Sequence, residues 1–448
     1  MTGGQAKVQK TAMSTLIQNL ITSTKSDLFD SFRPELVICA TIVGLLLARL
    51  FSLDRKVPPY WIALGGALLA FGLSLSDWSV ANSEGTLFTG LLVYDSFALF
   101  FRVLLLLFLV LVISLTVLSG IPDDDDGPDF YVLMLGSVVG MLLMASANHL
   151  LILFLGIEMA SVPSYALVGF LKGRRESSEA SLKFVVYGAG SAGVMLYGIS
   201  LLMGMAGTGD LVIFAESLST ALSSDGSSLG LLDPGVRTVV LGLTMVLVGF
   251  AFKLSAFPFH FWTPDAFQGA AAEIGGFLSV ASKAATFALL VRLSASLTHA
   301  SGALSDIMLY FGIGIGVIAS ITATFGNLAA YTQTNVKRLL AYSTIAHAGY
   351  MLMAVSALMV VRSAGGESVD SDDIAMHCVE GLIYYLVVYL FMNFGAFAIV
   401  ALIRNQIYSE ELDDYRGLAA QTPTLCVCML ICMFSLIGLH RSEDSLVN

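Results

Sequence analysis

Apolar runs long enough to cross a lipid bilayer recur along the whole of this 448-residue chain. The hydrocarbon core of a membrane is about 30 Å thick, and a helix needs about 20 residues to cross it. Hydrophobic residues make up 56% of the chain and charged residues only 12%. A soluble globular domain does not have this composition, so the sequence predicts an all-α polytopic membrane protein.

We expect about twelve transmembrane helices, with boundaries that are good to several residues. The predicted spans are 34–53, 59–75, 92–118, 130–147, 149–171, 181–206, 236–257, 272–296, 307–330, 336–361, 378–403 and 423–439. Residues 1–33 are interpreted as a polar N-terminal extension, because the apolar stretch inside them is too short to span. Residues 34–128 then form the N-terminal transmembrane helices.

Positive charges are distributed unevenly between the predicted loops. Placing the N-terminus outside puts most of them in the cytoplasm: Arg55, Lys56, Lys172, Arg174, Arg175, Lys337, Arg338, Arg404 and Arg416. The outer stretches 76–90 and 207–235 have no lysine or arginine. The positive-inside rule therefore favours an outside N-terminus, although four basic residues run against it: Lys7, Lys10, Lys25 and Arg33.

The net charge of −11 does not indicate a surface for basic partners, because much of it lies in the loop clusters 123–126 and 370–373. We expect no nucleic-acid partner. The five cysteines form no CxxC pair and are interpreted as packing residues rather than metal ligands or disulfides: Cys39, Cys378, Cys426, Cys428 and Cys432. The chain offers no nucleotide-binding loop and no metal-ligand spacing, so we expect it to bind no cofactor or metal itself.

Four of the ionisable residues within the apolar spans are singled out: Glu158, Lys183, Lys253 and Lys283. Each costs a few kcal/mol or more at the centre of a bilayer unless it finds a partner or water, so such residues usually face the interior of a helix bundle. Lys183 opens its span and could instead extend to the membrane surface. For Glu158 and Lys253 the alternative is a structural ion pair, and Lys283 falls between these cases.

Pro258 predicts a break in the helix that carries Lys253. Proline cannot donate to the carbonyl four residues earlier, which frees the carbonyl of Leu254, next to Lys253. Broken helices at membrane depth are tolerated where they line a hydrated cavity, so we expect water near this lysine. Burial disfavours its charged form and a nearby carboxylate favours it, which suits loading and release of a proton. His260 is either a proton carrier or a cap on the broken backbone.

Five segments carry a resemblance to a known family, and they follow one another over most of residues 130–400. They are GIEMASVPSYALVGF, SSEASLKFVVYGAGSAGVMLYGISLL, FKLSAFPFHFWTPDAFQGA, FLSVASKAATFALLVRL and QTNVKRLLAYSTIAHAGYMLM. Through them the chain resembles the antiporter-like membrane subunits of respiratory complex I, the proton-translocating NADH:quinone oxidoreductase. Within that family WTPDAFQG resembles the subunit called N in bacteria and 2 in mitochondria, whereas related subunits and cation/proton antiporters more often resemble WLPDAH.

The resemblance implies a fold of two inverted five-helix repeats, each with a broken helix. The first would occupy residues 129–300 and the second residues 301–439, followed by a polar tail at 440–448. The resemblance also implies a proton path through five matching residues, in which Lys183 faces Glu158. They are Glu158, Lys183, Lys253, His260 and Lys283.

The C-terminus departs from the family pattern. MLICMFSLIGL at 429–439 resembles the start of the second broken helix, but HRSEDSLVN follows where the family has a proline break and then a lysine. We therefore expect an incomplete second repeat, lacking about two of the family's fourteen spans. Three explanations compete: a frameshift or early stop, a split subunit completed by another chain, or a member that no longer pumps. The abrupt switch to polar sequence favours the first.

The resulting functional hypothesis is a membrane-arm subunit that couples quinone reduction to proton translocation in a bacterial plasma membrane. Its partners would be lipid, protons and the other membrane-arm subunits, and the sites for NADH, FMN, iron–sulfur clusters and quinone would lie in partner subunits. One alternative is a subunit of a multisubunit cation/proton antiporter. Another is a structural remnant that does not pump.

Overall fold

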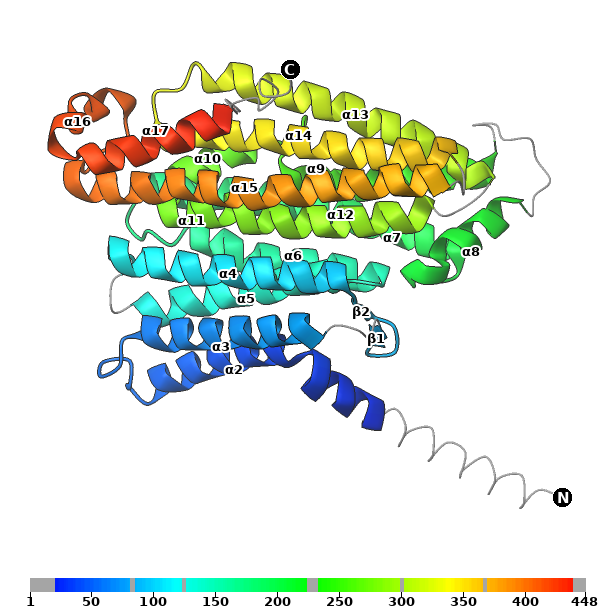
Figure 1. Cartoon of the computed structure of the whole chain (residues 1–448), viewed down its shortest axis with the longest axis horizontal. Helices are drawn as coiled ribbons and strands as arrows, with labels where there is room; N and C mark the ends of the chain where they lie inside the picture. The colour runs from blue at the N-terminus through cyan, green and yellow to red at the C-terminus, as the bar shows by residue number, and fades with distance from the viewer. Residues whose placement is uncertain are drawn as a thin grey trace, which may run out of the picture.

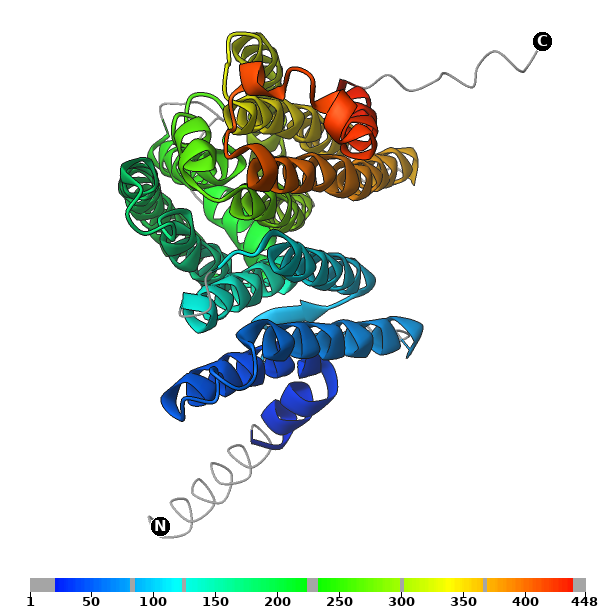
Figure 2. The same cartoon turned by 90° about the vertical axis from the view of Figure 1, so that its left-hand side faces the viewer.

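A computed structural model describes residues 21–80, 85–122, 126–223, 233–298, 302–365 and 369–437. Most of the predicted N-terminal extension and the whole of the predicted tail at 440–448 lie outside these residues. The described chain is a bundle of long helices whose axes run in nearly the same direction (Figure 1). Seen from the end, the N-terminal helices form a layer of their own beside the remaining bundle (Figure 2).

The N-terminal part contains three long helices and a small antiparallel hairpin. Its elements are η1 (Asp27–Ser31), α2 (Arg33–Leu50), α3 (Pro59–Val80), β1 (Gly85–Leu87), β2 (Leu92–Tyr94) and α4 (Ser96–Ser119). In the hairpin Gly85 pairs with Tyr94 and Leu87 with Leu92.

The middle of the chain contains the broken helix that the sequence predicted. Its elements are α5 (Gly127–Ser146), α6 (Leu150–Val168), α7 (Arg175–Ala206), α8 (Leu211–Ser223), α9 (Pro234–Leu254), α10 (Trp262–Gly269), α11 (Ala272–Phe277), the π-helix η3 (Leu278–Ser282) and α12 (Lys283–Thr298). The break separates α9 from the half-helix α10.

The C-terminal part is made of long helices joined to short ones. Its elements are α13 (Ala303–Ala330), α14 (Val336–Gly365), α15 (Val369–Ile407), the 3-10 helix η4 (Leu412–Tyr415), α16 (Leu418–Gln421) and α17 (Pro423–Ile437). The assignment of residues 129–300 and 301–439 to two inverted repeats stays a prediction.

The all-helical membrane fold is confirmed, whereas the number of spans is approximate. Among the described residues ten helices are long and apolar enough to cross a bilayer, and an eleventh span results if the helical segment Ile21–Ser31 and α2, which meet at 82°, are counted together. The last predicted span, 423–439, coincides with α17, which has fifteen described residues. At 1.5 Å per residue that helix is about 22 Å long, which is shorter than the hydrocarbon core.

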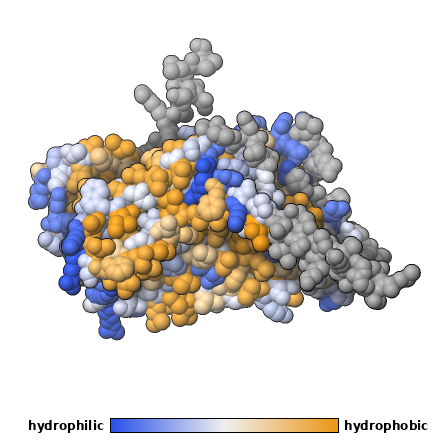
Figure 3. Space-filling model, turned by 90° about the horizontal axis from the view of Figure 1, so that it is seen from below, coloured by the Kyte–Doolittle hydropathy of each residue, from blue (hydrophilic) through white to orange (hydrophobic). Residues whose placement is uncertain are grey.

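Two helices begin well before their predicted spans. Helix α7 starts at Arg175 rather than at 181, and α15 starts at Val369 rather than at 378. Hydropathy detects only the apolar part of a helix, while a charged first turn continues the same backbone into water. Orange apolar side chains cover much of the face in Figure 3, with blue polar ones along the left-hand edge and in smaller groups elsewhere.

The segment Ala272–Thr298 lies at the centre of the bundle. Its apolar window is completely buried, whereas only 28% of the corresponding window of α7 is buried. Arg292 anchors this segment: it donates to Asp95 at the start of α4, at 2.8 and 3.0 Å, and to the carbonyl of Ala145. Burial alone would raise the pKa of Asp95, but the hydrogen bonds and charge of Arg292 hold it below its ordinary value.

Candidate functional site

Helix α9 ends at Leu254, four residues before Pro258, and regular structure resumes at Trp262. Ser255 ends the helix in the left-handed conformation, with φ of 60°. Side chains satisfy several backbone groups that the break frees. The Trp262 indole donates to the carbonyl of Phe252 at 3.0 Å, and the amide of Phe257 donates to the Thr322 hydroxyl at 3.0 Å. The break is therefore a built structure rather than a frayed helix end.

Lys283 binds the carbonyl beside the break. Its Nζ donates to the carbonyl oxygen of Leu254 at 3.0 Å and to that of Thr344 at 2.9 Å, and only 2% of the residue is exposed. Lys283 follows directly after the π-helix η3, whose wider turn changes the direction in which the next residues point. The carbonyl that we expected beside the Lys253 amine is thus bound by a lysine from another helix.

Lys253 is buried without a direct partner. Only 3% of it is exposed, and its Nζ makes no hydrogen bond or ion pair with any residue that the structure describes. Glu158 on α6 is half-buried, and it forms no ion pair within 4.0 Å in the described part of the chain. The two charges nevertheless interact through space. The structure therefore brings Glu158 and Lys253 into electrostatic range but not into contact.

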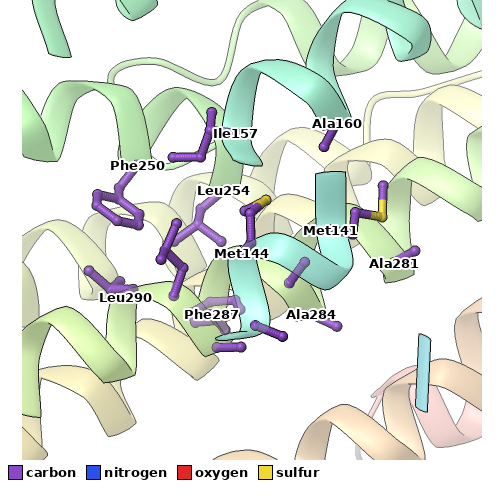
Figure 4. Close-up of a cluster of buried hydrophobic side chains, with 14 of the residues drawn as sticks. Met141, Met144, Ile157, Ala160, Phe250, Leu254, Ala281, Ala284, Phe287 and Leu290 are labelled. Atoms are coloured by element: carbon purple, nitrogen blue, oxygen red, sulfur yellow. The ribbon is translucent and has the colours of Figure 1, made fainter. Parts of the chain in front are cut away.

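Figure 4 shows a cluster of buried apolar side chains on the helices that carry Glu158, Lys253 and Lys283. Its labelled side chains come from α5, α6, α9, η3 and α12: Met141, Met144, Ile157, Ala160, Phe250, Leu254, Ala281, Ala284, Phe287 and Leu290. Three of them, Ile157, Leu254 and Ala284, are chain neighbours of Glu158, Lys253 and Lys283. A charge in such surroundings interacts more strongly than it would in water, which makes the unpaired amine of Lys253 sensitive to small movements of Glu158.

Lys183 lies apart from this interior group. Its side chain is 41% exposed and pairs with Asp265 at 2.8 Å and with Glu179 at 2.9 Å. We expected Lys183 to face Glu158, but the structure places it against the half-helix α10 instead. The reason is that Asp265 lies on α10, where it reaches the exposed end of α7 rather than the buried middle of α6.

His260 lies in the break inside an aromatic cage. It is 2% exposed, and its ring lies 4.4 Å from that of Phe261, 4.5 Å from that of Phe325 and 5.6 Å from that of Phe257. Its Nδ1 has no hydrogen-bond partner among the described residues. The structure thus places His260 in the break, against aromatic rings.

The sequence analysis did not single out several buried ionisable residues, among them His347 and Glu273. His347 on α14 is 3% exposed, its Nδ1 lies 2.5 Å from the hydroxyl of Tyr385, and it interacts electrostatically with Lys283. Glu273 on α11 is 1% exposed, and both its carboxyl oxygens lack a hydrogen-bond partner among the described residues. The rule that found Lys253 applies to both, because each is an ionisable residue within a run of apolar or small residues.

The arrangement can hold and pass protons rather than bind a metal. Within the described ranges no three His, Cys, Asp or Glu side chains are grouped closely enough to hold a metal ion. Glu158, Lys253, Lys283, His347 and Tyr385 are instead buried or half-buried titratable groups on α6, α9, α12, α14 and α15. Each can donate or accept a proton.

Comparison with known proteins identifies relatives over most of the chain. Residues 147–440 match the family model for the transmembrane region of NADH:quinone oxidoreductase and Mrp antiporter subunits. NADH-quinone oxidoreductase subunit N 2 of Chloroherpeton thalassium is 35% identical over 434 residues, which cover 94% of this chain and 78% of the relative. Subunit N of Anaeromyxobacter sp. is 39% identical over 421 residues, with coverage of 91% and 76%.

Solved structures agree with this pattern. A chain of respiratory complex I from Thermus thermophilus is 29% identical, with a TM-score of 0.67 and coverage of 91% of this chain and 78% of that one. A chain of the Mrp complex from Dietzia sp. has a TM-score of 0.71 at 18% identity, with coverage of 93% and 71%. At that identity the second likeness concerns the fold alone.

Proposed function

The chain belongs to the NADH:quinone oxidoreductase/Mrp antiporter transmembrane family, and from that premise we propose how it moves protons. It is a membrane-arm subunit of proton-translocating NADH:quinone oxidoreductase and works beside the other membrane-arm subunits. The chain is an integral membrane protein and part of a respiratory complex. We propose that the membrane is a bacterial plasma membrane with the N-terminus outside, which the distribution of positive loop charges supports.

The proposed proton carriers are Glu158, Lys253 and Lys283, with His260 as a further carrier in the break. The observation that supports this most strongly is the buried amine of Lys253, which makes no direct contact with a carboxylate in the described chain but lies within range of Glu158. Moving Glu158 closer favours the ammonium, and moving it away favours the neutral amine. A tenfold change in proton occupancy takes only about 1.4 kcal/mol, so a small movement is enough.

The next transfer would cross the break. Lys283 holds the carbonyl of Leu254, the residue after Lys253, so its amine is bonded to the backbone next to Lys253. A neutral Lys283 can still donate to that carbonyl, and it can therefore gain and lose a proton without giving up its position. His347 and Tyr385 would continue the path beyond it. Water in the break would carry the proton between these groups.

Lys183 has a different part in this proposal. Its two carboxylate partners fix an ammonium at the exposed end of α7, so it would deliver protons toward Glu158 only after leaving Asp265. Redox chemistry is left to other chains: we propose that the sites for NADH, FMN, iron–sulfur clusters and quinone lie in partner subunits. This chain would convert their conformational or electrostatic signal into proton movement.

The test is Lys253→Ala in membrane vesicles that contain the whole complex. We expect NADH-driven proton uptake to fall about a hundredfold, the lower end of what a positioned acid or base contributes, while a native gel shows that the complex still assembles. Lys172→Ala is the matched control, because the Lys172 side chain is 71% exposed. Unchanged proton uptake in Lys253→Ala would remove this lysine from the mechanism. Sodium-driven proton exchange in vesicles without the quinone reductase would indicate an antiporter instead.

A further inference from the structure

We propose that Asp265 and Glu410 are positioning residues for proton transfer. Together with Lys337 and Arg338 they form a clamp that holds the half-helix α10 in place and ties it to the connection after α15. This inference rests on the proposed function, because its importance depends on protons passing through the neighbouring lysines. The contacts that form the clamp all lie among described residues and do not depend on the proposed function.

The first set of contacts in the clamp involves side chains along α10. Asp265 accepts from two different helices: Oδ2 from Lys183 Nζ on α7 at 2.8 Å, and Oδ1 from Arg338 Nη1 on α14 at 2.7 Å. Arg338 Nη1 also donates to Gln268 at 3.0 Å, one turn further along α10. Packing supports the same arrangement, since the ring of Trp262 stacks on that of Phe184 at 4.1 Å. Helix α10 is therefore fastened to both α7 and α14.

The second set of contacts involves the backbone at the C-terminal end of α10. Lys337 Nζ donates to the carbonyl oxygen of Ala270, the residue that follows the helix, at 2.7 Å. Lys337 is 1% exposed, and its ammonium pairs with Glu410 Oε2 at 2.8 Å. A buried ammonium that loses its carboxylate is strongly destabilised, so Glu410 determines whether Lys337 can stay at Ala270.

Glu410 lies on the connection that follows α15, and this connection is bonded to the start of α14. The amide of Val336 donates to the carbonyl of Glu410 at 2.9 Å, and the amide of Leu412 donates to that of Thr334 at 2.8 Å. Arg404, near the end of α15, lies 3.7 Å from the other oxygen of Glu410. A displacement of α15 would therefore reach Lys337 through a short and largely bonded path.

The position of α10 matters for two candidate proton carriers. Through Asp265 it holds Lys183 away from Glu158. Through Ala270 it leads directly into α11 and η3, which set the direction of Lys283 and hence its bond to the carbonyl of Leu254. The clamp thus couples a connection more than 120 residues further along the chain to the surroundings of both lysines.

The experiment measures the position of α10 and proton pumping separately, in the assembled complex. In Glu410→Gln we expect amide hydrogen exchange in residues 262–270 to become at least tenfold faster, while exchange in residues 234–254 stays unchanged. The ratio of protons moved to electrons transferred should fall at least twofold. Glu410→Asp keeps the charge and should restore most of both quantities, which a merely space-filling side chain would not require.

Glu411→Gln is the matched control, because Glu411 is the exposed next residue and the glutamine oxygen can still accept from Asn335. Unchanged exchange in 262–270 for Glu410→Gln, or an equal increase for Glu411→Gln, would overturn the clamp. If Glu410→Gln prevents assembly, Arg338→Met replaces it, because methionine cannot donate to Asp265 or Gln268, both of which accept from Arg338 Nη1. That variant must then accelerate exchange in 262–270, and unchanged exchange again overturns the clamp.

The two proposals can fail separately. If Lys253→Ala abolishes pumping but Glu410→Gln leaves α10 unchanged, the proton path stands and the clamp is wrong. If Glu410→Gln loosens α10 but neither variant changes the proton-to-electron ratio, the contacts are structural and have no role in positioning proton carriers.

Discussion

The four lysines that matter in this chain fall into two regions with opposite kinds of partner. At the polar end of the bundle, Lys183 and Lys337 each contact a carboxylate at 2.9 Å or less. In the interior, Lys283 contacts two backbone carbonyls, and Lys253 contacts no polar group in the described chain. The side-chain chemistry is the same in all four, so the difference lies in what the fold places against the amine.

The kind of partner decides whether a lysine keeps a fixed positive charge or can exchange its proton. A carboxylate in contact makes the ammonium the stable form and fixes the lysine as a structural cation. A carbonyl oxygen accepts from both an ammonium and a neutral amine, although more weakly from the amine, so it orients the side chain in both states. The comparison teaches that the interior lysines are built to change protonation, whereas Lys183 and Lys337 keep their proton for as long as a carboxylate stays in contact.

Lys283→Met, in the interior region, should reduce proton pumping the most. The change keeps the approximate length of the side chain but leaves the buried carbonyls of Leu254 and Thr344 without their donor, at a cost of about 1–3 kcal/mol each. We expect proton uptake in vesicles to fall about a hundredfold, because a titratable group is lost as well. We also expect a lower thermal midpoint of the purified complex. Normal pumping in this variant would contradict the distinction between the two regions.

Tyr385→Phe should have an intermediate effect. It removes the hydroxyl that lies 2.5 Å from His347 Nδ1 and leaves the ring in place. Loss of one hydrogen bond of about 1 kcal/mol should slow proton uptake about fivefold. Tyr384→Phe is the control, since Tyr384 is the next residue and is 71% exposed. Equal rates in the two variants would place Tyr385 outside the proton path.

Glu179→Gln should have the smallest effect. The Glu179 side chain is 56% exposed and that of Lys183 is 41% exposed, so their ion pair is screened by water and contributes less than about 0.5 kcal/mol. We expect proton uptake to change less than about twofold. A loss as large as that in Lys283→Met would mean that the polar end of the bundle also exchanges protons during turnover.

The sequence was sufficient to predict the fold because the bilayer sets the length of each element. Every predicted span coincides with a helix, and the errors are confined to ends such as those of α7 and α15, where a charged turn extends the helix beyond its apolar part. The short α17 could not be separated from a full span by hydropathy, since its composition is apolar throughout.

The candidate site was only partly predictable, because partners come from tertiary structure. The cost of burying a charge pointed to Glu158, Lys253 and Lys283 without any structural information. The bond from Lys283 to Leu254 depends on a π-helix that no spacing rule reveals, and Asp265 is 82 residues away from Lys183 in sequence. His347 could have been found with the same rule of buried charge, whereas its contact with Tyr385 could not.

The most direct test of proton exchange at Lys253 is Lys253→Arg, measured as protons moved per electron in membrane vesicles that contain the whole complex. Arginine keeps the positive charge near Glu158 but does not release its proton at any pH that proteins experience. If proton exchange at this position is the function, Lys253→Arg must pump as poorly as Lys253→Ala. If Lys253→Arg retains the normal ratio while Lys253→Ala loses it, a fixed charge is sufficient and this account of the broken helix is wrong.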